Sequence, residues 1–157
     1  MKTLTLTIAF FLITLTSFAQ ADKYTIAIQK GITITDSAKT AENFTDAANY
    51  FERIATAEQK EWLPNYYAAF NHLNSALVGT QNSEAKDAIY DKAMVFADKA
   101  DVLMPNHSEV YALKAYIVFM KMAVSPQARA MTMIPQSAAL TEKAIALNPE
   151  NPRAYLM

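Results

Sequence analysis

The chain has 157 residues, of which 52% are hydrophobic, a formal net charge of −1, two glycines and no cysteine. This nearly balanced charge predicts no strong attraction to nucleic acid or to anionic lipid, and the lack of cysteine excludes disulfides and a thiol for lipid attachment. A chain so poor in glycine has few of the tight turns that an all-β fold requires, so an all-α fold is favoured.

Residues 1–21 have the three-part layout of a secretory signal peptide. One early charge, Lys2, precedes an apolar stretch, and the segment ends in the small residues around Gln20. A retained membrane anchor is the weaker alternative, because the stretch is short and interrupted by threonines, whereas a spanning helix needs about 20 mostly apolar residues. We expect cleavage after Ala19 or Ala21, a periplasmic or secreted protein, no membrane span after cleavage, and one domain over residues 22–157.

Residues 24–36 allow two interpretations. The isoleucines at positions 26, 28, 32 and 34 alternate around Gly31, as two short strands would. Positions 24, 27, 28, 31 and 32 lie instead on one helical face, and a lone hairpin is only marginally stable beside helices. A helix is the favoured interpretation and a pair of strands the alternative.

The segments that follow place apolar residues three and four positions apart, which is typical of helices. Thr40 and Ser83 stand where N-caps are needed, and Pro64 suits the first turn of a helix. The segment that begins at Glu109 is apolar almost all round, which predicts a central, buried helix. In chain order the predicted helices are Ala41–Ala57, Pro64–Leu77, Ser83–Met104, Glu109–Val124 and Pro135–Leu147.

Two segments near the C-terminus are predicted to be less regular. Ser125–Ile134, bounded by prolines, is interpreted as an irregular loop, which is either a plain spacer or the site of a partner contact through Arg129. Asn151 and Pro152 begin a last helix that is cut off at Met157 and has no partner or cap in the sequence. Either the chain is a fragment or ends against something else, or this end is a frayed tail.

A proline followed six residues later by an aromatic residue occurs three times, which indicates an internal repeat of stacked helical units. Spacings of 41 and 44 residues separate the three copies, which are Pro64 with Phe70, Pro105 with Tyr111, and Pro149 with Tyr155. In the last two copies an alanine, Ala100 or Ala144, also stands five residues before the proline.

The segments Ala97–Ala115 and Thr141–Met157 resemble the junctions of tetratricopeptide repeats. This resemblance implies an all-α, antiparallel helix-hairpin stack, a tetratricopeptide-like α-solenoid of about three units plus a partial fourth. It also implies binding of a protein or peptide in a concave groove, and no reaction. Other helical repeats of about 40 to 47 residues are the alternative, because the unit of that family is typically about 34 residues.

The resemblance also places groove-facing residues by their offset from the repeated aromatic. Together with Arg129, these positions are the predicted partner-binding residues. They are Asn71 and Ser75 in the first unit, Glu109, Tyr116 and Phe119 in the next, and Arg153 in the last.

No motif predicts catalysis, a metal or a cofactor. Two glycines cannot build a phosphate-binding loop, no serine or threonine lies in a nucleophile elbow, and His72 and His107 lack a second ligand at metal-binding spacing. The methionines at positions 120, 122, 131 and 133 would suit copper, but core packing or a spacer is the simpler interpretation. We therefore predict a non-enzymatic, exported scaffold for a protein or peptide.

The alternative function is a small-ligand or glycan-binding accessory protein of the cell envelope. Trp62, Tyr66 and Tyr67 lie close together in the sequence and would supply flat aromatic faces on which such a ligand could stack.

Overall fold

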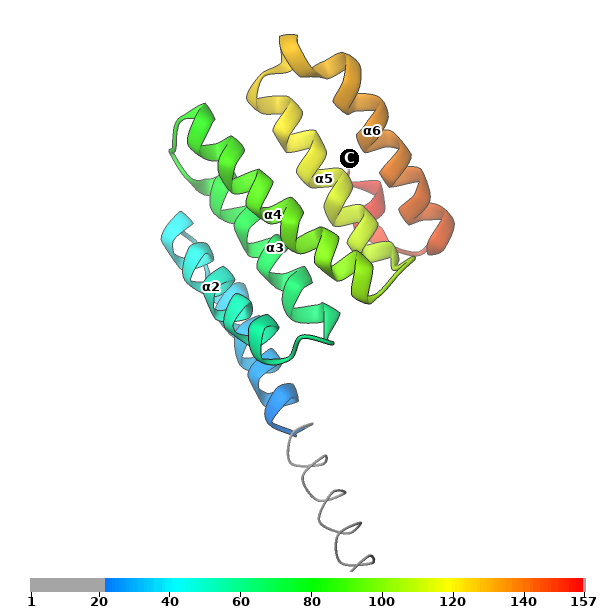
Figure 1. Cartoon of the computed structure of the whole chain (residues 1–157). Helices are drawn as coiled ribbons and strands as arrows, with labels where there is room; N and C mark the ends of the chain where they lie inside the picture. Colours follow the sequence, from blue (N-terminus) through cyan, green and yellow to red (C-terminus); the bar gives the residue numbers. More distant parts are fainter. Residues whose placement is uncertain (1–21, 157) are drawn as a thin grey trace, which may run out of the picture.

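The computed structural model describes residues 22–156, which form six α-helices and a short 3-10 helix and contain no β-strand (Figure 1). The predicted signal peptide lies outside this described part of the chain. In chain order the elements are a first helix over residues 22–37, α2 (Ala41–Ala57), α3 (Trp62–Val78), α4 (Ser83–Leu103), α5 (Ser108–Val124), α6 (Pro126–Leu147) and the 3-10 helix η1 (Pro152–Tyr155).

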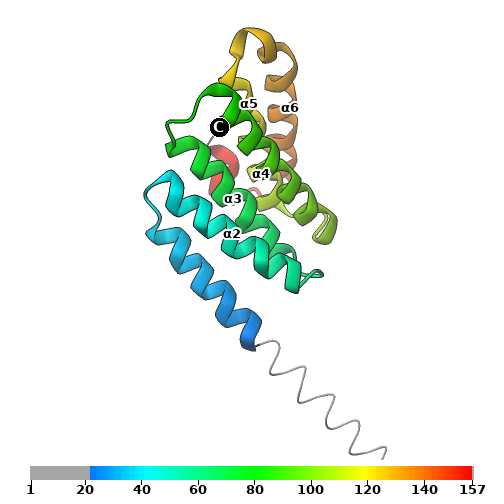
Figure 2. The ribbon, with the colours of Figure 1, turned by 60° about the vertical axis from the view of Figure 1, so that its left-hand side comes forward.

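Consecutive helices pack as antiparallel hairpins, and the stack grows in chain order from the first helix to α6 (Figures 1 and 2). The first helix also touches α3, α3 touches α5, and η1 packs on α5 and α6. The first helix, α3, α5 and η1 thus form an inner row, and α2, α4 and α6 form an outer row. The prediction of an all-α stack of helix hairpins is confirmed.

Small side chains allow these helices to approach closely. Fully buried alanines occupy the facing surfaces of α3, α4 and α5, where a methyl group keeps the distance between helix axes short. They are Ala69, Ala76, Ala93, Ala97, Ala100 and Ala115. Larger side chains such as Leu73, Tyr90 and Ile117 fill the space between these crossings. No helix within residues 22–156 combines the length and the apolar character needed to cross a bilayer.

The first helix settles the choice between helix and strand for residues 24–36 in favour of the helix. Ile28 and Gly31 face the stack, whereas Ile26 points to solvent, so the alternating isoleucines do not share a face. A Cβ atom on Gly31 would lie 2.7 Å from Cε1 of the buried Phe51. Glycine is therefore required here for close packing against α2.

Of the two predicted helix caps, Thr40 is confirmed and Ser83 is wrong. Thr40 Oγ1 accepts a hydrogen bond of 3.2 Å from the amide of Asn43, as predicted. At α4 the cap is Asn82 rather than Ser83, since Asn82 Oδ1 accepts from the amide of Ala85 at 2.9 Å. Ser83 is instead the first helical residue, because an asparagine in extended conformation just before it caps equally well.

The predicted loop Ser125–Ile134 is wrong, because α6 begins at Pro126 and continues through Pro135 to Leu147. A proline in the first turn costs no hydrogen bond, but Pro135 leaves the carbonyl of Met131 without its helical donor. Met131 is 92% exposed, so water can satisfy that carbonyl. The first turns of α6 run at an angle to the rest of the helix (Figure 1).

The first predicted copy of the repeat lies five residues out of register with the turns at the other two copies. Pro105 and Pro149 lie in the turns before α5 and η1, whereas Pro64 lies inside the first turn of α3. The residue that corresponds to Pro105 in the turn before α3 is Gln59. Proline is tolerated both in such turns and in a first helical turn, so its presence alone does not fix the register.

The segment at the C-terminal end of the described residues is capped and packed, contrary to expectation. Asn151 Oδ1 accepts from the amide of Arg153 at 3.0 Å, and Asn151 Nδ2 donates to Ser108 Oγ at 2.8 Å. Ser108 Oγ in turn donates to the carbonyl of Ala144 at 2.7 Å. This buried chain of hydrogen bonds joins η1 to the start of α5 and the end of α6.

Candidate functional site

A pocket of about 460 Å³ opens between α3, α5 and η1, and we call it the inner pocket. Its lining is mostly apolar and aromatic, with one charged member. The residues are Tyr66, Phe70, Leu73, Ala112, Leu113, Tyr116, Arg153 and Leu156. Pockets of roughly 300–1,000 Å³ with apolar walls and a few polar groups are typical of small-molecule sites.

Helical spacing explains how the two long walls form. Tyr66, Phe70 and Leu73 lie four and three positions apart on α3, so they share one face. The wall on α5 includes Ala112, whose small side chain leaves the space that a larger residue would fill. The two walls thus combine aromatic rings on α3 with a short side chain on α5.

The third wall comes from Arg153 in η1 and from Leu156, which directly follows η1. The position of η1 follows from the buried side chain of Asn151 and the hydrogen-bonded chain to Ser108 and Ala144. The amide of Leu156 donates to the carbonyl of Arg153, which continues the turn. Anchoring η1 on α5 and α6 thus brings a cation and an exposed leucine to the edge of the inner pocket.

The polar edge of the inner pocket is a cluster of three side chains. Arg153 Nη1 donates to Glu109 Oε2 at 2.7 Å, and the Tyr66 hydroxyl donates to the same oxygen at 3.1 Å. Burial, together with the neighbouring Glu109 carboxylate, raises the pKa of Tyr66. The hydrogen bond to Glu109 raises the pKa of Arg153. At neutral pH this edge therefore presents a protonated phenol and a guanidinium cation.

Aromatic side chains continue around the inner pocket, but most are engaged with one another. Tyr66 and Phe70 are stacked with ring centroids 6.4 Å apart, and Tyr67 stacks on Phe51 at 4.9 Å. Trp62 packs on His107 at 4.5 Å. Of the three aromatic faces predicted for a small ligand, Tyr66 lines the inner pocket.

The structure brings together three of the predicted partner-binding residues. Tyr116 and Arg153 line the inner pocket, and Glu109 binds Arg153 at its edge. Phe119 is exposed one turn beyond Tyr116 on α5 and is not part of the pocket lining.

The other three predicted residues lie elsewhere and make internal bonds. Asn71 is buried and donates to Thr35 Oγ1 at 2.9 Å, and the buried Ser75 donates to the carbonyl of Ala41 at 2.9 Å. Arg129 lies in α6 rather than in a loop, and its two terminal nitrogens donate to the two Asp87 oxygens at 2.7 and 2.8 Å. Burial and pairing thus remove these side chains from the inner pocket.

Phe70, Leu73, Ala112, Leu113 and Leu156 also line the inner pocket and were missed, because no offset from the repeated aromatic selected them. A correct register would have found two of them. If Gln59 replaces Pro64 as the equivalent of Pro105, the offsets that selected Tyr116 and Phe119 select Phe70 and Leu73 in α3.

A second pocket, of about 610 Å³, lies on the outer row mainly between α2 and α4, and we call it the outer pocket. Its walls mix both signs of charge with apolar groups, and its rim residue Val102 is 78% exposed. The lining comprises Glu52, Ala55, Thr56, Gln59, Asn65, Phe96, Asp98, Lys99, Val102 and Leu103.

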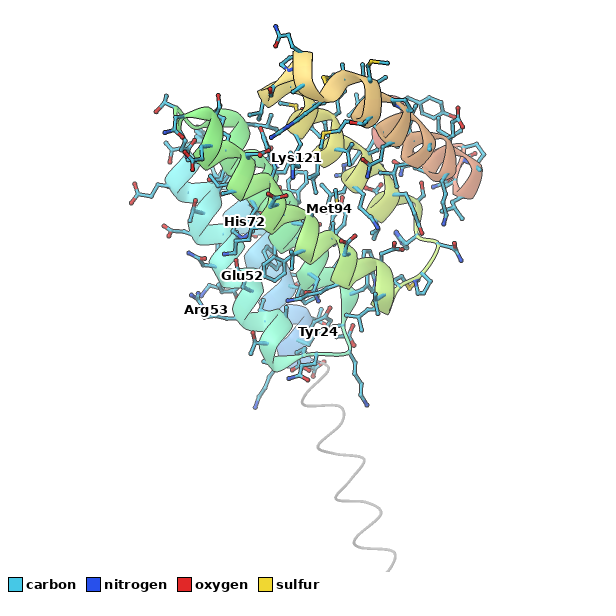
Figure 3. The ribbon with its side chains drawn as sticks, turned by 45° about the horizontal axis from the view of Figure 1, so that its top comes forward. Tyr24, Glu52, Arg53, His72, Met94 and Lys121 are labelled. Atoms are coloured by element: carbon cyan, nitrogen blue, oxygen red, sulfur yellow. The ribbon has the colours of Figure 1, made fainter. Side chains whose placement is uncertain are left out.

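At the outer pocket, Glu52 of α2 bonds His72 of α3 at 2.6 Å (Figure 3). The same Glu52 oxygen pairs with Lys92 of α4 at 2.7 Å. Burial lowers the pKa of His72. Although burial opposes the shift, hydrogen bonds from Lys92 and His72 lower the pKa of Glu52. This cluster ties three helices together. Over residues 22–156 no group of three or more histidine, aspartate or glutamate side chains is arranged to hold a metal ion.

The fold is similar to that of a solved binding protein. No protein-family model matches the chain, so the tetratricopeptide resemblance is not confirmed, and no curated protein matches it. Among solved structures, the chain is similar to the HusA haemophore from Porphyromonas gingivalis, with a TM-score of 0.74 and 29% sequence identity over 84% of this chain. The chain spans 64% of the length of that haemophore.

Proposed function

We propose that this protein is an exported, non-enzymatic binder of a small, flat, mostly apolar ligand of the haem class, and that the inner pocket is its site. The observation that carries this proposal is the apolar, aromatic-lined inner pocket with a cation at its edge, in a chain 29% identical to a haemophore. Of the two functions predicted from the sequence, this favours the small-ligand accessory protein over the scaffold for a protein or peptide.

A haem-class ligand fits the chemistry of the inner pocket in two ways. Its porphyrin ring is flat and apolar and would contact the aromatic and aliphatic walls, since aromatic rings contribute both area and stacking. Its carboxylates would lie near Arg153, because guanidinium groups bind carboxylates with directed hydrogen bonds. The ring and the acidic groups are therefore recognised at opposite parts of the site.

The lining offers little for strong iron coordination. Haem iron is usually bound by histidine, cysteine, methionine or tyrosinate, and the inner-pocket lining contains only tyrosines of this set. The Tyr66 hydroxyl is occupied by Glu109, and burial raises its pKa, which disfavours the tyrosinate form. Tyr116 is the other tyrosine of the lining. We expect recognition to rest mainly on the porphyrin body and its carboxylates, so that iron-free protoporphyrin IX binds within about tenfold of haem.

A matched pair of substitutions tests the location of the site. Leu156 at the inner pocket and Val102 at the outer pocket are 79% and 78% exposed, so a change to aspartate should leave the fold intact at either position. Haem titrated into the chain from Asp22 onward, followed by its Soret absorbance, should bind at least about tenfold more weakly to Leu156→Asp, because the new carboxylate opposes both the apolar ring and its acidic groups. The Val102→Asp variant should bind as the wild type does.

Opposite results would reject the proposal. A loss of affinity confined to Val102→Asp would place the ligand in the outer pocket. No Soret change with the wild-type protein at micromolar concentration would reject haem-class binding altogether.

A further inference from the structure

Arg153, the group that would bind an acidic ligand, already forms an ion pair with Glu109 at the edge of the inner pocket. Among the residues that line the inner pocket, the charged one is Arg153, and its Nη1 already donates to Glu109 Oε2 at 2.7 Å. A ligand carboxylate that approaches this guanidinium therefore meets a side-chain carboxylate in the same position. Glu109 imitates, within the protein, the acidic group of a ligand.

The pair is exposed enough to be exchanged. The side chains of Arg153 and Glu109 are 55% and 27% exposed, and ion pairs in contact with solvent are weak. Breaking a buried pair would instead leave an uncompensated charge away from water. Exchange of one carboxylate for another at Arg153 thus carries only a small penalty.

Glu109 also has a second partner that remains after exchange. The buried Tyr66 hydroxyl donates to Glu109 Oε2 at 3.1 Å, so a displaced Glu109 keeps one hydrogen bond as well as contact with water. Glu109 lies in the first turn of α5, where the helix N-terminus favours a negative charge. The carboxylate therefore stays stable at its position whether or not Arg153 is bound to it.

We propose that Glu109 holds Arg153 in the free protein and is displaced from it by a ligand carboxylate, so that Glu109 sets how strongly the inner pocket prefers acidic ligands. This inference rests on the proposed function. It assigns the ligand a carboxylate beside its apolar body and assigns Glu109 the role of an internal competitor. Ligands without an acidic group bind next to the intact pair and gain nothing from Arg153.

The test compares protoporphyrin IX with its dimethyl ester, which are iron-free probes that differ only in their acidic groups. Glu109→Gln keeps an acceptor for Tyr66 and Arg153 but removes the competing charge. It should bind the diacid about two- to fivefold more tightly than the wild type and leave binding of the ester unchanged, a range that follows from the small free energy of exposed ion pairs. Glu142→Gln, an exposed substitution on α6, is the matched control and should change neither affinity.

Removal of the cation completes the test. Arg153→Met should weaken the diacid and abolish the gain from Glu109→Gln, with ester binding retained as the sign of an intact pocket. The inference is overturned if Glu109→Gln weakens the diacid or leaves it unchanged, if the ester gains equally, or if the gain persists without Arg153. Failure of both probes to bind the wild type would instead overturn the proposed function itself.

Discussion

Replacing Asn151 with alanine should release η1 from α5 and α6. The Asn151 side chain is 1% exposed and makes two hydrogen bonds, as the cap of η1 and as the donor to Ser108. Loss of an N-cap costs about 0.5–2 kcal/mol, and loss of a buried hydrogen bond costs about 1 kcal/mol. We therefore expect η1 to be less stable by about 2 kcal/mol, which corresponds to roughly a 30-fold increase in its local opening.

Hydrogen exchange measured by mass spectrometry can localise this effect. The amides of Ala154 and Leu156 are bonded within the last turn, so a peptide that covers residues 148–157 should exchange faster in Asn151→Ala. Asn148→Ala is the control, because the Asn148 side chain makes only an exposed bond to the amide of Glu150. Unchanged exchange in the C-terminal peptide, or an equal increase in every peptide of the protein, would refute the assigned role of Asn151.

Three further predictions concern the first helix, pH and export. Gly31→Ala should lower the free energy of unfolding by about 1–3 kcal/mol, because the added Cβ would crowd the Phe51 ring. Urea denaturation measures this change, and an unchanged midpoint would contradict the close approach of Gly31 to Phe51. Burial lowers the pKa of His72 from its usual value near 6.5, so the unfolded chain binds a proton at a higher pH than the folded chain does. The contribution of neutral His72 to the free energy of unfolding should therefore be fully present above about pH 6.5 and decrease as the pH falls below it. His72→Gln should flatten this acid-side dependence of Tm, and an equal dependence in that variant would reject His72 as a source. Mass spectrometry of the exported full-length chain should find an N-terminus after Ala19 or Ala21, and an uncleaved chain would contradict the signal peptide.

Helix periodicity was sufficient for most of the fold. The bounds of α2 were predicted without error, and the ends of α5 and α6 were placed at Val124 and Leu147, because apolar spacing and end signals agree there. The start of α6 was missed because a proline usually ends a helix, and the exposure of Met131 that makes Pro135 tolerable depends on tertiary structure. Rules based on the local sequence thus failed where exposure to solvent decides whether a helix tolerates a proline.

The offsets counted from the repeated aromatic selected three residues that lie at the inner pocket, and the same offsets failed on α3. Glu109, Tyr116 and Arg153 converge because the turns at Pro105 and Pro149 are equivalent, so equal offsets lead to one side of the stack.

The turn before α3 has neither the proline nor the later aromatic residue that define the repeat at the other two turns. Gln59 stands where proline is expected, and Asn65 replaces the aromatic. The nearest proline lies five residues later, and a five-residue shift is more than one turn of helix, about 140° past a full rotation. Offsets counted from it therefore selected Asn71 and Ser75, which face Thr35 and the start of α2, and passed over Phe70 and Leu73 at the pocket. Offsets counted from one junction therefore identify a shared face of a helix stack only where the junctions are correctly aligned.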